Sequence, residues 1–141
     1  MVQKEIEQIL KTHKNIAVVG LSRDTEKDSF RVAAYLKKHG FRIVPINPFA
    51  AEILGEKSYR SLLDLPVEIQ REIDIVDIFR RSEDVLSIVE QAVALKARYG
   101  KPDVVWMQLG ITNERAAEAA ERAGLTVIMN KCVMIEHAHL N

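Results

Sequence analysis

The residues best suited to chemistry lie in one stretch near the N-terminus, Asn15–Ser29, which reads NIAVVGLSRDTEKDS. Its apolar run Ile16–Val19 ends at Gly20, and the polar residues that follow include Lys27 and lead through Asp28-Ser29 into an amphipathic segment. A buried strand, a glycine turn and a capped helix form an anion-binding corner, because the first N–H groups of a helix have no partner within it and the helix dipole favours negative charge. Gly20 has no Cβ and would let the backbone approach that anion closely. The stretch therefore predicts an anionic ligand, with a nucleotide as the first candidate.

Two well-known phosphate-binding motifs are absent from this loop. The dinucleotide fingerprint G-x-G-x-x-G would need glycines at the positions that Ser22 and Thr25 occupy. The Walker pattern G-x-x-x-x-G-K-[ST] is also missing. The simpler alternative is that Gly20 only ends a strand.

Polar and cationic residues follow the other expected strands as well. They are Asn47-Pro48, Phe79-Arg80-Arg81, Gln108-Leu109-Gly110 and Asn130-Lys131-Cys132. Ligands of parallel α/β sheets bind beyond the carboxyl ends of the strands, so these residues share the expected ligand edge. A NAD-binding domain carries Asp or Glu after its second strand to hold the ribose, and Asn47 in that place disfavours a dehydrogenase. Arg80 and Arg81 could bind a phosphate through paired hydrogen bonds, although two solvated loop arginines are the plain alternative.

Candidates for catalysis are few. Asp77 lies inside an expected strand, where it is expected to hydrogen-bond to neighbouring backbone. Cys132 and His137 could form a nucleophile and a base, but a lone cysteine after a final strand is usually buried and inert. His137 and His139 lack a third ligand and are a weak signal for a metal. We therefore predict neither catalytic residues nor a metal site.

The composition excludes several classes of protein. The 141 residues suffice for a single domain, and the 20 Lys and Arg balance the 20 Asp and Glu, so no excess of positive charge indicates nucleic acid. The single cysteine, Cys132, fits a reducing compartment. No run approaches the roughly 20 apolar residues of a membrane span, and the charged N-terminal segment does not resemble a signal peptide. We expect a cytoplasmic protein that binds neither nucleic acid nor membrane, with a partner protein possible.

Hydrophobic patterning predicts five strands that alternate with helices. The expected strands are Ile16–Val19, Phe41–Ile46, Ile73–Phe79, Val104–Gln108 and Leu125–Met129. Their near-continuous apolar character is typical of parallel strands covered on both faces. We therefore predict one α/β domain over residues 1–141, Rossmann-like and doubly wound, with a mainly parallel five-stranded sheet and an N-terminal helix over residues 2–13 packed on it.

Residues between the strands predict where helices begin and end. Asp28 and Ser29 should cap the second helix and Thr112 the alanine-rich helix, while Ser82–Asp84 should cap the helix between them. Pro66 should stop a short helical piece, and the tail from residue 130 shows no clear period.

Six segments taken in order carry a family resemblance. They are AVVGLS with Lys27 and Ser29, then FRIVPINP, ILGEKSYRSLLDLP, DIVDIFR, VVWMQLGI and AGLTVIMNKC, which run from about residue 15 to 132. Together they resemble the CoA-binding domain family and are similar to the N-terminal domain of the succinyl-CoA synthetase alpha subunit.

The resemblance implies a bound coenzyme A (CoA) or short acyl-CoA. Its pyrophosphate would lie on the Gly20 loop near Lys27 and Ser29, its adenosine between the Asn47 and Phe79 turns, and its pantetheine along the Gln108–Gly110 edge. From their position just past the third strand, Arg80 or Arg81 is expected to meet the 3′-phosphate, with Arg80 as the first candidate. The implied binding residues are Gly20, Leu21, Ser22, Arg23, Lys27, Ser29, Val32, Asn47, Pro48, Phe79, Arg80, Arg81, Val85, Gln108 and Gly110.

Two departures from the family pattern bear on function. The loop Ser22–Glu26 carries two acids and lacks the proline expected before the lysine. His137 and His139 do not match the phosphorylated-histidine motif of the synthetase, so its ligase activity is not implied. We expect a stand-alone CoA-binding carrier, sensor or regulatory module. The alternatives are an enzyme or subunit of acyl-CoA metabolism that acts through Cys132 or a partner chain, and a NAD-type nucleotide sensor.

Overall fold

A five-stranded parallel sheet forms the centre of the structure, a computed structural model that describes residues 2–140. The strand order is β2-β1-β5-β6-β7, and every neighbouring pair is parallel. The strands are β1 (Asn15–Val19), β2 (Arg42–Ile46), β5 (Ile75–Ile78), β6 (Val104–Met107) and β7 (Thr126–Ile128). The predicted sheet is therefore confirmed, with strand ends that differ by one or two residues from those expected.

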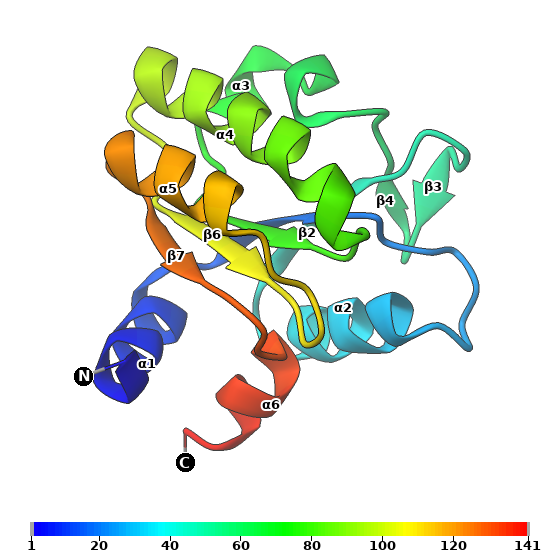
Figure 1. The fold of residues 1–141 in the computed structure, drawn as a ribbon. Coiled ribbons are helices and arrows are strands. Elements are labelled where there is room, and N and C mark those ends of the chain that lie inside the picture. The colour runs from blue at the N-terminus through cyan, green and yellow to red at the C-terminus, as the bar shows by residue number, and fades with distance from the viewer. Residues whose placement is uncertain (1, 141) are drawn as a thin grey trace.

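Helices cover both faces of this sheet (Figure 1). One face carries α4 (Val85–Tyr99), α5 (Glu114–Arg122) and the short α3 (Val67–Gln70), while the other carries α1 (Val2–Thr12), α2 (Asp28–Lys38) and α6 (Val133–Ala138). Each face has its own apolar core, because successive residues of a strand point to opposite sides. Val76 and Ile78 pack toward α4, whereas Ile75 packs on the opposite face. This is the doubly wound α/β arrangement that the apolar strands predicted.

Several helix boundaries differ from the expected ones. Lys27, not Asp28 or Ser29, is the N-cap of α2, and its side chain makes no capping hydrogen bond. Asn113 rather than Thr112 caps α5, since its side chain accepts a hydrogen bond from the N–H of Ala116. The tail expected to have no period contains α6.

The segment between β2 and β5 contains elements too short to leave a pattern. The strands β3 (Glu52–Ile53) and β4 (Glu56–Lys57) have two residues each and form an antiparallel hairpin. Tyr59 then forms a single parallel bridge with Ile46 at the end of β2. The turn η1 (Leu62–Asp64) follows. Pro66 does not simply stop this turn, because it is also the N-cap of α3.

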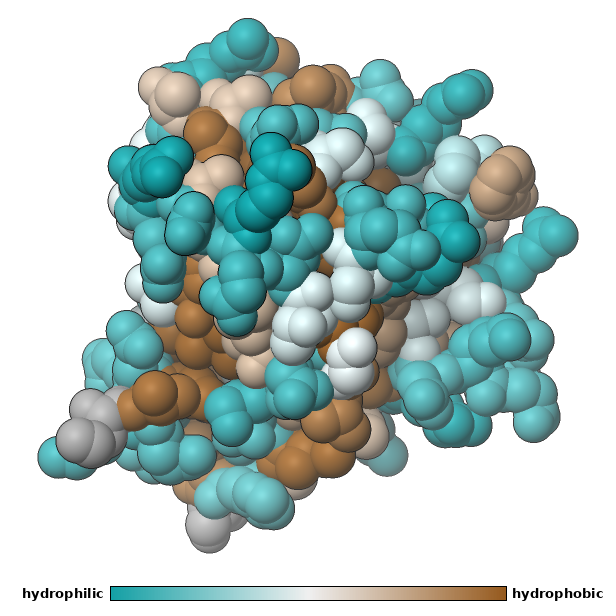
Figure 2. Space-filling model, viewed as in Figure 1, coloured by the Kyte–Doolittle hydropathy of each residue, from teal (hydrophilic) through white to brown (hydrophobic). Residues whose placement is uncertain are grey.

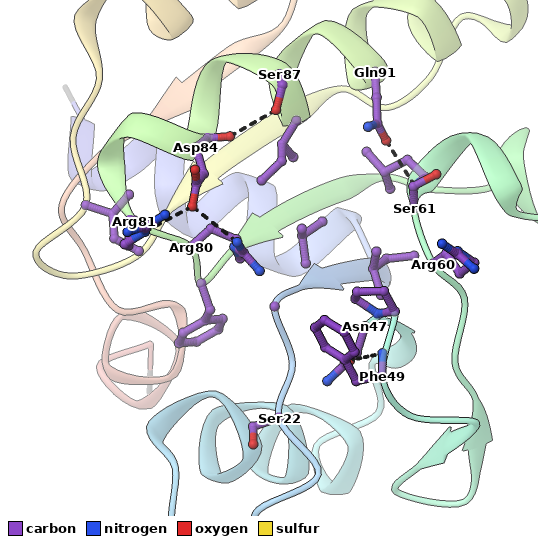
Figure 3. Close-up of a pocket in the computed structure, with 18 residues that line it drawn as sticks. Ser22, Asn47, Phe49, Arg60, Ser61, Arg80, Arg81, Asp84, Ser87 and Gln91 are labelled. Atoms are coloured by element: carbon purple, nitrogen blue, oxygen red, sulfur yellow. Dashed lines mark hydrogen bonds and ion pairs between the residues drawn. The ribbon is translucent and has the colours of Figure 1, made fainter.

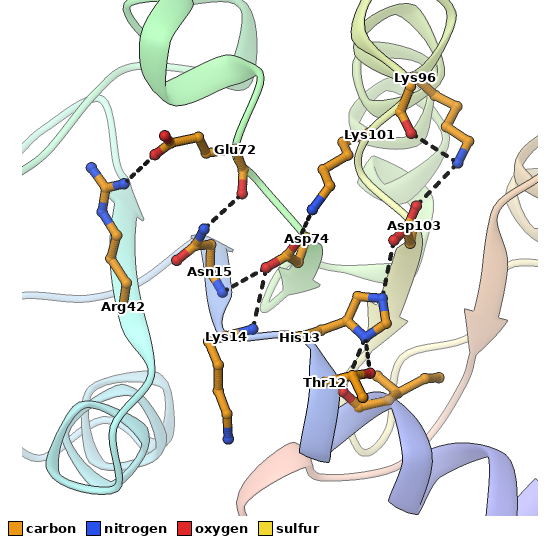
Figure 4. A network of polar contacts seen from close by, with 12 residues as sticks. Thr12, His13, Lys14, Asn15, Arg42, Glu72, Asp74, Lys96, Lys101 and Asp103 are labelled. Atoms are coloured by element: carbon orange, nitrogen blue, oxygen red, sulfur yellow. Dashed lines mark hydrogen bonds and ion pairs between the residues drawn. The ribbon is translucent and has the colours of Figure 1, made fainter.

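Two carboxylates tie together the amino-terminal ends of the strands (Figure 4). Asp74 accepts hydrogen bonds from the backbone N–H groups of Lys14, at 3.2 Å, and Asn15, at 3.0 Å, and pairs with Lys101. Asp103 contacts His13 Nε2 at 3.0 Å and Lys96 Nζ at 3.2 Å. Desolvation raises the pKa of Asp103, but the hydrogen bonds from Lys96 and His13 outweigh it and hold the pKa below its ordinary value. The network braces the edge opposite the strands' carboxyl ends.

Asp77 occupies the middle of the sheet without a polar partner. It pairs in register with Val18 on one side and Trp106 on the other, and its side chain is fully buried. Neither carboxyl oxygen has a hydrogen-bond partner among residues 2–140. The expected hydrogen bond from Asp77 to neighbouring backbone is therefore wrong. Burial raises the pKa of Asp77 well above its ordinary value, because ionisation would place an unpaired charge in the core.

Strand β7 forms one edge of the sheet, and apolar side chains reach the surface along it (Figure 2). Val127 is half-buried there, as is Met129 just beyond the strand. Across residues 2–140, none of the helices has the length and apolarity needed to cross a bilayer.

Candidate functional site

The strand order creates a switch point between β1 and β5. The chain passes from β1 to β2 on one side and then returns to β5 on the other, so the two connections diverge above the carboxyl ends of β1 and β5. Ligands of open α/β sheets bind at such a point. A cavity of about 780 Å³ lies there, within the range of roughly 300–1,000 Å³ typical of small-molecule and cofactor sites. Of the predicted site residues it is lined by Gly20, Ser22, Asn47, Pro48, Phe79, Arg80 and Arg81.

Gly20 is required where two loops cross at the switch point. Its φ is +88°, and a Cβ at this position would lie 2.3 Å from the carbonyl oxygen of Phe79. Both crossing segments are fixed by the sheet, since Gly20 N–H donates to Ile46 O at 2.9 Å and Phe79 N–H donates to Val19 O at 2.8 Å. The glycine therefore does more than end a strand. In this structure the space its missing side chain leaves is filled by the Phe79 turn.

The loop after Gly20 is folded on itself. Ser22 Oγ accepts a hydrogen bond from the N–H of Asp24, and Asp24 in turn accepts one from Glu26. Ser29 is buried, and its hydroxyl accepts a hydrogen bond from the N–H of Ser22 at 3.0 Å. Lys27 is exposed and, like the exposed Arg23, is not among the residues that line the cavity. The Asp24 carboxylate therefore stabilises a turn of this loop.

Asn47 braces the turn after β2. Its amide nitrogen donates to the carbonyl oxygen of Leu21 at 2.9 Å, and its amide oxygen accepts from the N–H of Phe49 at 2.7 Å. Phe49 itself is 83% exposed at the rim of the cavity. These two hydrogen bonds fix the orientation of the Asn47 amide, which is neutral where a NAD site carries an acid.

Arg80 and Arg81 enter the cavity wall from the turn after β5, and both contact Asp84 (Figure 3). Arg80 Nη2 lies 3.2 Å and Arg81 Nε 3.3 Å from Asp84 Oδ2, and Arg81 also lies 3.8 Å from Glu83. The hydrogen bond from Arg80 is the main cause that holds the pKa of Asp84 below its ordinary value. This acid stays ionised and partly neutralises the arginine pair.

The remaining predicted residues lie outside the cavity lining. Leu21, Val32 and Val85 are buried in the two cores. Gln108 is buried, and its Oε1 accepts a hydrogen bond from the N–H of Val133, which ties β6 to α6. Gly110 is exposed, and its N–H donates to Asn130.

Cys132, considered as a nucleophile, lies in the apolar core, and His137, considered as its base, has another partner. Cys132 is buried, as expected of a lone cysteine after a final strand. His137 Nδ1 lies 2.9 Å from the hydroxyl of Tyr35 on α2. Burial is the main cause that lowers the pKa of His137, and the nearby His39 and Lys14 add to it. Among residues 2–140, no group of three His, Cys, Asp or Glu side chains could hold a metal ion.

The cavity also has walls that sequence reasoning missed. They are supplied by the Phe49 turn, by the segment Arg60–Leu62 and by one face of α4, chiefly Ser87, Ile88 and Gln91. Arg60 is brought to the ligand edge by the single bridge between Tyr59 and Ile46. One bridge leaves no periodic pattern, and the only available signal was an arginine next to the SLLDLP run.

The family model for the CoA binding domain matches residues 14–138, nearly the whole chain. The chain belongs to the CoA-binding domain family. It is 40% identical over 134 residues to YneT of Bacillus subtilis, an uncharacterized protein, and this match covers 95% of the chain and 93% of YneT. A hypothetical protein from Pyrococcus horikoshii has the same fold, with a TM-score of 0.89 and 37% identity over 99% of this chain and 92% of its own.

The family also includes a domain of larger enzymes. The chain is 32% identical over 125 residues to an ADP-forming acetate–CoA ligase of Archaeoglobus fulgidus, but the match spans 81% of this chain and only 17% of the ligase. An acetyl-coenzyme A synthetase from Korarchaeum cryptofilum shares the fold with a TM-score of 0.65 at 25% identity, over 81% of this chain and 25% of its own. The CoA-binding family thus contains both proteins of this length and domains within ligases.

Proposed function

We propose that this protein is a stand-alone binding module for CoA or a short acyl-CoA, acting as a carrier, sensor or regulatory subunit. The observation that carries the proposal is the cavity of about 780 Å³ at the switch point, whose charged lining consists of three arginines, Arg60, Arg80 and Arg81, and one acid, Asp84. A net positive cavity beside apolar groups such as Phe49 and Ile111 suits a ligand that combines phosphates with an adenine ring. Family membership supports the same ligand class.

The first turn of α2 supports a place for the pyrophosphate. The N–H groups of residues 28–30 have no acceptor within the helix, as at any helix start. Lys27 adds a cation directly before them. We propose that the pyrophosphate lies between this helix start and Ser22, with the adenosine toward Asn47-Pro48 and the pantetheine toward the Gln108–Gly110 edge.

Asn47 argues against the alternative of a NAD sensor. A NAD site carries an ionised acid after β2 to accept from the ribose hydroxyls, whereas Asn47 is neutral and its amide is oriented by hydrogen bonds to Leu21 and Phe49. The alternative of a subunit in acyl-CoA metabolism rests on the likeness to the ligase of Archaeoglobus fulgidus. It would place the chemistry in a partner chain. A cytoplasmic location fits the single, buried and unpaired Cys132.

Calorimetric titration with CoA, acetyl-CoA, NAD and ATP tests the proposal. We expect CoA to bind at least roughly tenfold more tightly than NAD, a difference of about 1.4 kcal/mol. NAD binding more tightly than CoA would overturn it. Release of free thiol from acetyl-CoA, followed with a thiol reagent, distinguishes a binding module from a hydrolase or transferase, since a binding module leaves the thioester intact.

A further inference from the structure

We infer that Arg60 is the residue that recognises the 3′-phosphate of CoA and so distinguishes CoA from other adenine nucleotides. This inference rests on the proposed function. The 3′-phosphate is the group of the adenosine end that ATP and NAD lack, so the cation that meets it determines specificity. Three arginines line the cavity, and their existing contacts decide between them.

Arg80 and Arg81 are already paired with acids. Asp84 Oδ2 is the partner of both, at 3.2 and 3.3 Å, and Arg81 also lies near Glu83. A dianionic phosphate brought to this pair would lie beside the Asp84 carboxylate, because Asp84 also lines the cavity. Like charges at such short range repel, which weakens any gain from the two arginines.

Arg60 has no such partner. Among residues 2–140, no acidic side chain lies within 4.0 Å of its guanidinium in an ion pair, and it makes no side-chain hydrogen bond. Figure 3 shows Arg60 beside Asn47 and Phe49, across the cavity from Asp84 and its two arginines. The guanidinium is therefore available, with its hydrogen-bond donors in the planar arrangement that matches a phosphate.

The backbone holds Arg60 next to the turn that follows β2. Tyr59 N–H donates to Pro45 O at 3.1 Å, and Asn47 N–H donates to Tyr59 O at 2.8 Å. Both backbone polar groups of the residue before Arg60 are therefore bonded to the end of β2. Ser58 Oγ adds a hydrogen bond to Asn47 O at 3.1 Å. Arg60 thus starts from a fixed point beside Asn47-Pro48, where the adenosine is proposed to lie.

A second donor lies at the same end of the cavity. The side-chain oxygen of Gln91 on α4 accepts a hydrogen bond from the N–H of Leu62 at 3.2 Å, which orients its amide group. The NH₂ of Gln91 remains as a donor, and Ser61, which also lines this end, donates its hydroxyl to Asp64. Arg60 and Gln91 therefore form a cationic, donor-rich end, and Asp84, the acid of the cavity lining, lies across the cavity from it (Figure 3).

The test compares CoA with 3′-dephospho-CoA on the wild type, Arg60→Gln, Arg80→Ala and Arg81→Ala. We expect the wild type to prefer CoA by roughly tenfold or more, as one charge-assisted contact commonly provides. Arg60→Gln should reduce this preference to below about threefold and leave dephospho-CoA binding nearly unchanged. Arg80→Ala and Arg81→Ala should retain the preference. The wild-type preference should also shrink with added salt, because the guanidinium is exposed.

Arg71→Gln is the matched control, because Arg71 is an exposed arginine outside the cavity and its replacement changes the net charge equally. If Arg71→Gln lowers the preference as much as Arg60→Gln, the effect is one of overall charge and the inference fails. It also fails if the wild type binds both ligands equally or if only Arg80→Ala or Arg81→Ala removes the preference. In these cases CoA still binds and the proposed function stands. If neither ligand binds, the proposed function is wrong and the role of Arg60 with it.

Discussion

Replacement of Gly20 by alanine tests whether the switch point depends on two loops crossing at close range. A Cβ on residue 20 would lie 2.3 Å from Phe79 O and 3.0 Å from Arg80 Cδ. The Phe79 carbonyl would have to retreat by about 0.7 Å before the first contact even reached 3.0 Å. Hydrogen bonds to β1 and β2 anchor both segments, so the strain would be shared among backbone groups rather than relieved by one flexible side chain.

Gly40→Ala is the matched control for this experiment. Gly40 has a φ of +93°, close to the +88° of Gly20, but a Cβ there would meet nothing within 4 Å. Both variants carry the cost of a positive φ, about 1–2 kcal/mol. Only Gly20→Ala also brings the new Cβ into steric overlap with Phe79 O. Overpacking of this kind typically destabilises a protein by roughly 1–3 kcal/mol.

The measurement is urea unfolding followed by circular dichroism, together with CoA affinity of each folded variant. We expect Gly20→Ala to lose about 1–3 kcal/mol more stability than Gly40→Ala. We also expect it to bind CoA more weakly, because the displaced turn carries Arg80. Equal losses of stability in the two variants would show that the short contact does not determine the need for glycine.

Two further predictions concern Asp77, whose expected hydrogen bond is absent, and Asn47, which braces the turn after β2. Burial raises the pKa of Asp77, so its contribution to stability is complete below the unfolded value of about 3.9 and is lost as the pH rises toward the folded pKa. In that window the stability of the wild type relative to Asp77→Asn should fall by about 1.4 kcal/mol per pH unit, and urea titrations with parallel pH profiles for the two proteins would contradict this. Asn47→Asp supplies the acid of a NAD site but sets a carboxylate against the Leu21 carbonyl. It should lose about 1–3 kcal/mol of stability in the same assay, and unchanged stability would refute the bracing role of Asn47. The variant should also gain no affinity for NAD by calorimetry.

The sheet could be predicted because buried parallel strands are apolar on both faces. Ile16–Val19 and Val104–Met107 have no alternation that would suit an exposed strand, and both are fully internal to the sheet. Gly20 and the arginines after β5 followed from the same reasoning, since the carboxyl ends of such strands form the ligand edge. The strands and the residues that directly follow them could be predicted because each is determined by a few residues adjacent in the sequence.

The rest depends on contacts between distant segments. Arg60 reaches the cavity through one bridge, and Gln91 through the packing of α4 against η1, and neither contact leaves a local pattern. Asp77 was misread because a polar residue in an apolar run is normally satisfied by a neighbour. The position of Lys27 outside the cavity lining depends on how the loop folds on its own hydroxyl and carboxylate groups.

The buried Asp77 has a spectroscopic consequence. The chain holds 20 acidic side chains, and at a pH of about 6 exposed carboxyls are ionised. A carboxyl whose pKa is raised by burial stays protonated to a higher pH than an exposed one. The C=O stretch of a protonated carboxyl absorbs in the infrared apart from the carboxylate bands. Asp77 lies between Val18 and Trp106, on the strand whose turn carries Arg80. The C=O band of Asp77 can be identified because it is absent from the spectrum of Asp77→Asn. A shift of this band in infrared difference spectra with and without ligand would show, without a label, that ligand binding changes the interior of the sheet.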